Sequence, residues 1–370
     1  MDATFEIFLA ALPGLEAMLA DEARQAGFAE VTEVPGGVTL RGAWAEVWRA
    51  NLELRGAGRV LARIGEFRAF HLAQLDKRSR RFPWSEVLRP DVPVRVEVTT
   101  SKKSKIYHAG AARERVARAI AEELGAPVAE DAGLRVMMRI DDNLCTLSLD
   151  TSGEPLRRRG HKEAVGKAPL RETTAALFLR ACGYVGNEPV LDPMCGSGTF
   201  VIEAAEIASG LNPGRSRRFA FEDLATFDAG AWAAMKARPA PARPQILFHG
   251  SDRDQGAIGM ATANAGRAGV GDLCRFERRA ISDLLRPEGP PGLVMVNPPY
   301  GERIGDRKLL FGLYGALGGV LRDRFAGWRV GLVTSDTGLA HATGLPFDPP
   351  GPPVVHGGLK IRLFRTGPLP

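Results

Sequence analysis

Cysteine is scarce in this sequence of 370 residues. There are four cysteines, and no two of them form a Cys-x-x-Cys pair. This spacing argues against a zinc site and against a disulfide framework, so we expect no metal and a reducing, cytoplasmic location. No stretch approaches the roughly 18 apolar residues of a membrane helix, and the acidic first residues are not typical of a signal peptide. We therefore expect no membrane partner.

The charge balance is modestly basic. Lysine and arginine outnumber aspartate and glutamate by 49 to 43, which gives a formal net charge of +6 and a pI of about 9.3. Such an excess favours a polyanionic partner, although many proteins are basic without binding one. The hydrophobic share of 45% and the charged share of 25% are those of an ordinary globular protein. The length predicts about two or three domains.

The first 155 residues alternate strand patterns with helix patterns. We assign residues 1–65 to one small α+β domain and residues 66–155 to a second. The loops of the second domain carry repeated basic side chains, which make it the candidate for binding a polyanion. The candidates in one such loop are Lys102, Lys103 and Lys105.

Residues 156–370 form the third expected domain, which opens with a basic linker over 156–170. From about residue 189 onward, strands and helices alternate in the manner of a doubly wound parallel sheet. The stretch 293–296 is apolar throughout, as expected for a strand buried on both faces. The sequence therefore predicts an α/β fold with a Rossmann-like C-terminal domain.

A glycine-containing loop follows the first strand of this domain and precedes a helix. Gly196 and Gly198 allow the backbone to turn sharply and approach a ligand, and the helix N-terminus offers free N–H groups to an anion. The spacing matches neither the dinucleotide fingerprint nor a phosphate-binding loop. Two interpretations stay open: a site for the amino-acid end of S-adenosylmethionine, and a tight turn without a ligand. The candidate cofactor residues are Asp192, Pro193, Cys195, Gly196, Gly198 and Thr199.

An acid ends the next strand. In a doubly wound sheet, a carboxylate at the position of Asp252 can accept hydrogen bonds from ribose hydroxyls. Alternatively, Asp252 caps the helix that is expected to begin near Gln255.

The segment Asn297, Pro298, Pro299, Tyr300 follows the apolar strand. An aromatic exocyclic amine is a poor nucleophile, because its lone pair is delocalised into the ring. The side-chain oxygen of Asn297 and the carbonyl of Pro298 can each accept one of its N–H groups, which orients the lone pair toward a methyl donor. Tyr300 offers a face for stacking the base. The alternative is a rigid surface turn.

The linker carries a run of basic side chains. Arg158, Arg159, His161 and Lys162 are candidates for holding the phosphates of a polyanionic partner. A solvated run of charge without a partner is the alternative interpretation.

Several segments together resemble one known family. Residues 104–108, 156–161, 168–173, 191–205 and 297–303 are similar to those of THUMP-domain RNA methyltransferases, and in particular to the bacterial 23S ribosomal RNA guanine-N2 methyltransferase group. The resemblance implies a ferredoxin-like domain, a THUMP domain that docks RNA, and a Rossmann-like methyltransferase domain. It also implies S-adenosylmethionine as the cofactor and N2-methylguanine as the product.

One position departs from the pattern of the relatives. They often carry an acid near the cofactor adenine, where this sequence has Ala280. Asp283, three residues later, is the candidate substitute, and backbone contacts are the alternative.

The resemblance and the residues leave several functions open. The preferred one is transfer of a methyl group to guanine N2 in RNA. The rivals are a tRNA guanine-N2 enzyme, a DNA adenine-N6 methyltransferase, and an RNA-binding assembly factor without catalysis. The sequence indicates no obligate protein partner.

Overall fold

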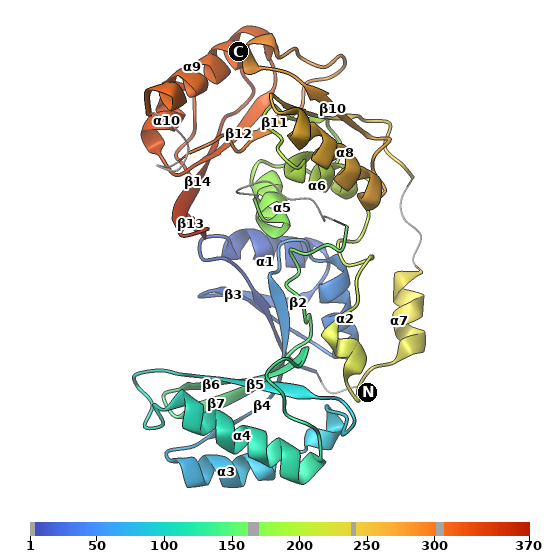
Figure 1. Ribbon diagram of the computed structural model, residues 1–370, viewed down its shortest axis with the longest axis vertical. Helices are drawn as coiled ribbons and strands as arrows, with labels where there is room; N and C mark the ends of the chain where they lie inside the picture. The colour runs from blue at the N-terminus through green and yellow to red at the C-terminus, as the bar shows by residue number, and fades with distance from the viewer. Residues whose placement is uncertain (1–3, 162–169, 238–241, 301–306) are drawn as a thin grey trace. The chain divides into compact units, whose positions relative to one another are not determined.

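The computed structural model describes residues 4–161, 170–237, 242–300 and 307–370. The described chain divides into two compact units (Figure 1). The N-terminal unit comprises residues 4–11, 20–156 and a segment that begins at Arg217. The C-terminal unit comprises residues 12–19, 157–216 and 242–370.

One seven-stranded sheet runs through the whole N-terminal unit, in the order β2-β3-β1-β4-β7-β6-β5. Only β5 and β6 run parallel, and the other neighbours are antiparallel. The expected domain boundary at residues 65 and 66 falls inside β4, so the two parts share a sheet. The strands are β1 (Phe5–Ala10), β2 (Ala29–Val34), β3 (Gly37–Gly42), β4 (Arg59–Arg68), β5 (Val94–Thr100), β6 (Leu134–Asp141) and β7 (Leu144–Asp150).

Strand alternation explains which face of this sheet is covered. Ile7, Ala62, Leu149, Val136 and Val96 stand opposite one another in register across five strands, and all five are buried. Since successive side chains point to opposite faces, these residues mark one continuous apolar face. The helices of the unit are α2 (Trp44–Glu53), α3 (Leu72–Arg80), α4 (Ala109–Leu124), α7 (Ala229–Lys236) and the part of α1 (Glu16–Gln25) from residue 20 onward. Helices α3 and α4 lie side by side (Figure 1).

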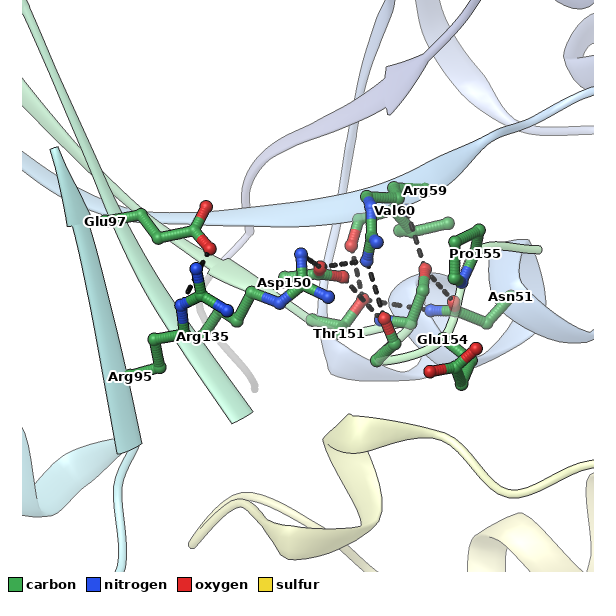
Figure 2. Close-up of polar contacts among 12 residues, drawn as sticks. Asn51, Arg59, Val60, Arg95, Glu97, Arg135, Asp150, Thr151, Glu154 and Pro155 are labelled. Atoms are coloured by element: carbon green, nitrogen blue, oxygen red, sulfur yellow. Dashed lines mark hydrogen bonds and ion pairs between the residues drawn. The ribbon is translucent and has the colours of Figure 1, made fainter. Parts of the chain in front are cut away.

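A buried carboxylate organises the end of β7. Asp150 is fully buried, forms an ion pair with Arg59, and has Arg135 Nη1 3.7 Å from its Oδ2 (Figure 2). Burial raises the pKa of Asp150 in spite of these two cations. Nearby, Arg217 donates to the carbonyls of Ser152 and Glu154, at 3.1 Å and 2.5 Å. That contact attaches the segment beginning at Arg217 to the N-terminal unit, which the sequence did not indicate.

The C-terminal unit contains the expected doubly wound sheet, in the order β10-β9-β8-β11-β12-β14-β13. The first five strands in this order are parallel, and β14 is antiparallel to β12. The prediction of a Rossmann-like domain is therefore confirmed. The strands are β8 (Val190–Asp192), β9 (Phe248–Asp252), β10 (Cys274–Arg278), β11 (Leu293–Val296), β12 (Arg329–Thr334), β13 (Val354–His356) and β14 (Leu359–Arg365).

Helices pack against this sheet (Figure 1). α6 contacts β8 and β9, α8 contacts β9 and β10, and α10 contacts β12. The helices are α5 (Glu172–Ala181), α6 (Thr199–Ala208), α8 (Gln255–Ala268), α9 (Arg307–Arg324) and α10 (Thr337–Ala342). None of the helices in the described residues combines the length and the apolar character that crossing a membrane requires.

Candidate active site at the switch point of the parallel sheet

The carboxyl ends of β8 and β11 are neighbours, because Val190 pairs with Leu293 and Leu191 pairs with Val294. From this pair the sheet grows toward β9 on one side and toward β12 on the other. Ligands of open α/β sheets bind at such a switch point. The glycine loop leaves β8 here and Asn297 leaves β11 here, so the fold brings together the two segments singled out in the sequence.

The glycine loop is shaped for a close ligand. Gly196 has a φ of 52°, and a Cβ placed on it would meet nothing within 4 Å. Gly198 has a φ of 86°, caps the N-terminus of α6, and would bring a Cβ to 3.1 Å from Ala261. Gly196 therefore faces open space, where a ligand can approach the backbone. Gly198 is needed because a larger side chain there would crowd Ala261.

The other loop candidates are largely buried. Pro193, Cys195 and Thr199 are all in this class, so they contribute mainly backbone to the site. Burial raises the pKa of the Cys195 thiol, which favours its neutral form over the thiolate.

Asp192 lies almost fully buried at the end of β8. Its Oδ1 accepts a hydrogen bond from the Met194 amide at 3.0 Å. Burial raises the pKa of Asp192 to about 8, and the nearby charge of Asp252 acts in the same direction. A buried acid beside a second acid is an environment that favours binding a group with hydrogen-bond donors or positive charge.

Asp252 joins the loop after β8 to the end of β9. Its Oδ2 accepts from the Gly196 amide at 3.0 Å, and its Oδ1 accepts from the Asp254 amide at 3.0 Å. The helix cap belongs to Asp254, whose Oδ1 accepts from the Gly256 amide at 2.8 Å at the start of α8. The capping alternative for Asp252 is therefore wrong. Each carboxylate oxygen can still accept a further hydrogen bond from a ribose.

Asn264 also supports the loop, and the sequence analysis missed it. This fully buried side chain on α8 donates from Nδ2 to the Ser197 carbonyl at 3.1 Å. A lone asparagine in an alanine-rich helix pattern carries no signal for this contact, because the partner lies 67 positions away in the sequence.

Asn297 carries the most informative polar atom of the site. Its Oδ1 is buried and has no hydrogen-bond partner among the residues that the structure describes. A buried acceptor without a donor is rare, because burial removes its hydrogen bonds to water and no protein hydrogen bond replaces them. Oδ1 of Asn297 is thus available for a donor that a bound molecule brings.

Tyr300 stands at the border of the apolar core. The ring is partly buried against a cluster that includes Leu191, Val294 and Leu284, and burial raises its pKa to about 12. Met194 and Ile281 pack against the same cluster. Three side chains from three different loops therefore provide apolar surface beside the glycine loop.

Asp283, the candidate substitute near the adenine, is exposed and lies in the short helix η3 (Ile281–Asp283). Its Oδ1 accepts from the Ser282 hydroxyl at 3.2 Å. Ile281, which the sequence analysis did not name, is the residue of this segment that packs beside the site.

The linker requires a correction. Arg159 is 1% exposed and its Nη2 lies 3.1 Å from Glu203 Oε1, while His161 is 5% exposed with its Nε2 3.6 Å from Glu206 Oε1. Burial lowers the pKa of His161 against the opposing effect of Glu206. The prediction that Arg159 and His161 contact RNA phosphates is wrong for these two residues, because α6 holds both inside the fold.

The other basic residues proposed to bind RNA that the structure describes are exposed. Arg158 is exposed, and Lys162 lies outside the described residues. Lys102, Lys103 and Lys105 are all exposed in the loop that precedes α4. Tyr107 in the same loop is 69% exposed, so basic and aromatic surface occur together. Over the described ranges, no group of three or more His, Cys, Asp or Glu side chains could hold a metal ion.

The fold and the site define a class of protein, the Rossmann-like methyltransferases. Three features of the parallel sheet are typical of this class: a glycine loop after the first strand, an acid at the end of the second, and Asn-Pro-Pro-Tyr after the fourth. Residues 159–345 match the RMKL-like methyltransferase domain family, and residues 6–61 match the RlmL ferredoxin-like domain. The chain belongs to this RMKL-like methyltransferase family, and it carries the ferredoxin-like domain expected at its N-terminus. The predicted family is thereby confirmed.

Two curated relatives are named ribosomal RNA large subunit methyltransferase K/L. The protein from Photobacterium profundum is 36% identical over 328 residues, which cover 85% of this chain and 46% of the relative. The protein from Syntrophotalea carbinolica is 36% identical over 365 residues, which cover 93% of this chain and 51% of the relative. The chain thus spans about half the length of the curated relatives it matches.

A solved structure, that of SMU.472 complexed with SAH, resembles the whole chain. It has a TM-score of 0.88 and 27% sequence identity, and the match covers 100% of both chains. The likeness therefore extends over both compact units.

Proposed function

We propose that this protein transfers a methyl group from S-adenosylmethionine to the exocyclic N2 of a guanine in RNA, with 23S ribosomal RNA as the substrate. The observation that carries the proposal is the buried Oδ1 of Asn297, which lies beside the glycine loop and has no donor among the described residues. Curated relatives named as large subunit ribosomal RNA methyltransferases support the choice of RNA.

The cofactor supplies an electrophilic methyl group when it is bound. The backbone of Gly196 and Gly198 and the N-terminus of α6 suit its amino-acid end, since free N–H groups there favour a carboxylate. Asp192 suits a donor-bearing or cationic group, and Asp252 suits ribose hydroxyls. Ile281 suits the face of the adenine ring, with Asp283 at its exposed side.

The residues after β11 prepare the target amine. Asn297 Oδ1 accepts one N–H of the amine and the Pro298 carbonyl accepts the other, so that the nitrogen becomes more pyramidal. Tyr300 stacks on the base. The amine can release its proton after methyl transfer, so this mechanism assigns no general base.

RNA docking falls to exposed basic side chains. Lys102, Lys103 and Lys105 are exposed beside Tyr107, a combination suited to phosphates and unstacked bases. Arg158 is the exposed candidate in the linker. We assign residues 66–155 to a THUMP domain on this basis, after a ferredoxin-like domain over 1–65 and before the methyltransferase domain over 156–370, of which the segment that begins at Arg217 belongs to the N-terminal compact unit. A ribosomal RNA substrate also implies a cytoplasmic location.

The rival functions share parts of the site. A tRNA guanine-N2 enzyme needs the same target-amine residues, and Asn-Pro-Pro-Tyr would equally serve adenine N6 in DNA. A non-catalytic assembly factor would not need a buried acceptor at Asn297 that no described residue satisfies, so this oxygen argues for catalysis.

Nucleoside mass spectrometry tests the proposal directly. RNA from a deletion strain is compared with RNA from its parent and from strains complemented by the wild type or by Asn297→Ala. Loss of one N2-methylguanine from 23S RNA, restored only by the wild type, supports the proposal. Loss of N2-methylguanine from tRNA would identify tRNA as the substrate in place of ribosomal RNA. Loss of N6-methyladenine from DNA would indicate a DNA adenine methyltransferase. An unchanged set of nucleosides would favour the non-catalytic assembly factor.

A further inference from the structure

One tyrosine outside the Asn297–Tyr300 segment reaches that segment from within the core. Tyr314 lies on α9 and is fully buried. Its hydroxyl donates to the Pro299 carbonyl at 3.3 Å and lies 3.3 Å from Thr334 Oγ1 at the end of β12. The sequence analysis did not single out Tyr314, and the proposed chemistry does not use it.

The segment depends on carbonyl contacts because of its prolines. Pro298 and Pro299 have no N–H, so a hydrogen bond can hold either residue only through its carbonyl oxygen. The Pro298 carbonyl is reserved for the target amine in the proposed function. The Pro299 carbonyl therefore remains free to receive a hydrogen bond from the fold, and Tyr314 donates to it, in addition to the packing of the Tyr300 ring.

The direction of the hydrogen bonds is settled by counting protons. The Tyr314 hydroxyl has one proton and two acceptors within 3.3 Å, the Pro299 carbonyl and Thr334 Oγ1. The carbonyl can only accept, so when Tyr314 donates to Pro299 its contact with Thr334 is a hydrogen bond in which the threonine hydroxyl donates. Thr334 Oγ1 itself accepts from the Asp336 amide at 3.2 Å. The result is a chain of donors from Asp336 through Thr334 and Tyr314 to Pro299. Burial raises the pKa of Tyr314, so its hydroxyl stays protonated as a donor across ordinary assay pH.

We propose that Tyr314 is a positioning residue for methyl transfer: it clamps the Pro299 carbonyl, and thereby fixes Asn297 Oδ1 and the Pro298 carbonyl in the orientation that receives the target amine. The proposal rests on the proposed function for its catalytic consequence. Misplacement of a reacting group by about 1 Å can slow a reaction by about 100-fold. Loss of one clamp that leaves the ring packing intact is expected to have a smaller effect.

The decisive variant is Tyr314→Phe, and the chain offers a matched control. Tyr184 is also buried and donates its hydroxyl to a carbonyl, that of Ala204, at 2.9 Å. We expect Tyr314→Phe to lower kcat about tenfold and to leave the KM for RNA and for S-adenosylmethionine within about twofold of the wild type. Tyr184→Phe should leave kcat within about twofold.

Thr334 gives a second test of the same chain of donors. Thr334→Val removes the hydroxyl at nearly constant volume and should lower kcat in the same direction as Tyr314→Phe. Thr334→Ser keeps the hydroxyl and should restore kcat. A loss of kcat in Thr334→Ser as large as that in Thr334→Val would show that any change of packing at this position lowers kcat, and the donor chain would then not be responsible.

Hydrogen–deuterium exchange measures the clamp without any turnover. Within residues 297–300 only Asn297 and Tyr300 have a backbone N–H, so a peptide across this segment reports on the turn through these two amides. Tyr314→Phe should speed its exchange several-fold, and Tyr184→Phe should not.

The outcomes separate the two proposals. Unchanged exchange and unchanged kcat in Tyr314→Phe would overturn the clamp. If Tyr314→Phe and Tyr184→Phe both lowered kcat and the melting temperature to the same extent, the effect of Tyr314 would be one of general stability, and the clamp would be overturned. Faster exchange in Tyr314→Phe, in a protein whose wild type methylates no RNA, would keep the clamp and reject the proposed function.

Discussion

Arg159 and Glu203 form an ion pair inside the C-terminal unit, with Nη2 and Oε1 3.1 Å apart and with side chains that are 1% and 2% exposed. The arginine belongs to the linker and the glutamate belongs to α6, the helix that begins at the glycine loop. The pair therefore attaches the linker to the helix that follows the glycine loop.

Arg159→Ala should destabilise the C-terminal unit. Removing one member of a buried ion pair leaves the other charge in a poorly hydrated place, which typically costs about 3–5 kcal/mol. Urea unfolding measures this as a lower midpoint. Arg24→Ala is the control, because its pair with Asp21 is about half exposed and should contribute less than about 1 kcal/mol. Equal midpoints for Arg159→Ala and the wild type would contradict the structural role of the pair.

Asn297→Ala should abolish turnover and leave cofactor binding nearly intact. The variant removes an acceptor that no described residue uses, so folding should tolerate it, while methyl transfer should slow by at least about 100-fold. Isothermal titration with S-adenosylmethionine and a methylation assay give the two readouts. A loss of cofactor affinity as large as the loss of turnover would make Asn297 a structural residue.

Asp252→Ala and Asp254→Ala form a matched pair two residues apart. Asp252 holds the Gly196 amide, so its removal should weaken S-adenosylmethionine binding by about 1–3 kcal/mol. Asp254 caps α8, so its removal should lower stability by about 1 kcal/mol and leave cofactor affinity unchanged. Titration calorimetry and thermal melting of both variants check this. If both variants lost the same affinity for S-adenosylmethionine, the specific role of Asp252 would be contradicted, and the whole loop after β9 would be responsible for binding.

Replacing Lys102, Lys103 and Lys105 by alanine should weaken RNA binding and flatten its salt dependence. Each phosphate of a single-stranded partner that is no longer neutralised should reduce the slope of log K against log salt by about 0.7. Filter binding at several salt concentrations measures the slope. Arg24→Ala serves as the control, because this arginine is paired with Asp21 and lies outside the proposed docking loop, so its removal should leave the slope unchanged. The docking assignment fails when the triple variant keeps the slope of the wild type.

Asp192 should make the ligand-free protein less stable as the pH rises. The folded pKa of about 8 lies above the value of about 4 expected for an unfolded aspartate, so the folded state holds its proton over a range where the unfolded state has lost it. The stability is fully present below about pH 4 and is lost as the pH approaches 8. Melting temperature against pH should fall more steeply in the wild type than in Asp192→Asn. Identical curves would show that Asp192 does not titrate in this way.

Local patterns predicted the elements of the C-terminal unit and the position of its two chemical segments. The apolar run 293–296 forms β11, and the glycine loop lies between β8 and α6 as expected. The reason is geometric: parallel strands place their carboxyl ends at one edge, so motifs that follow two such strands meet whenever the strands are neighbours. Hydrophobic alternation is a local property, and it can be read without knowledge of the fold.

Tertiary structure decided the role of individual polar side chains. The basic run at Arg158, Arg159 and His161 looks uniform in the sequence, yet α6 buries two of its members against Glu203 and Glu206 and leaves Arg158 exposed. Tyr314 reaches Pro299 only because α9 packs in one apolar cluster with β11 and β12. The sequence by itself determined the fold class and the chemistry that the site can offer, through local periodicity and the residues after each strand. Which charges are buried and which hydroxyl holds the turn depend on partners tens of residues away, and only the packed structure brings those partners within hydrogen-bond distance.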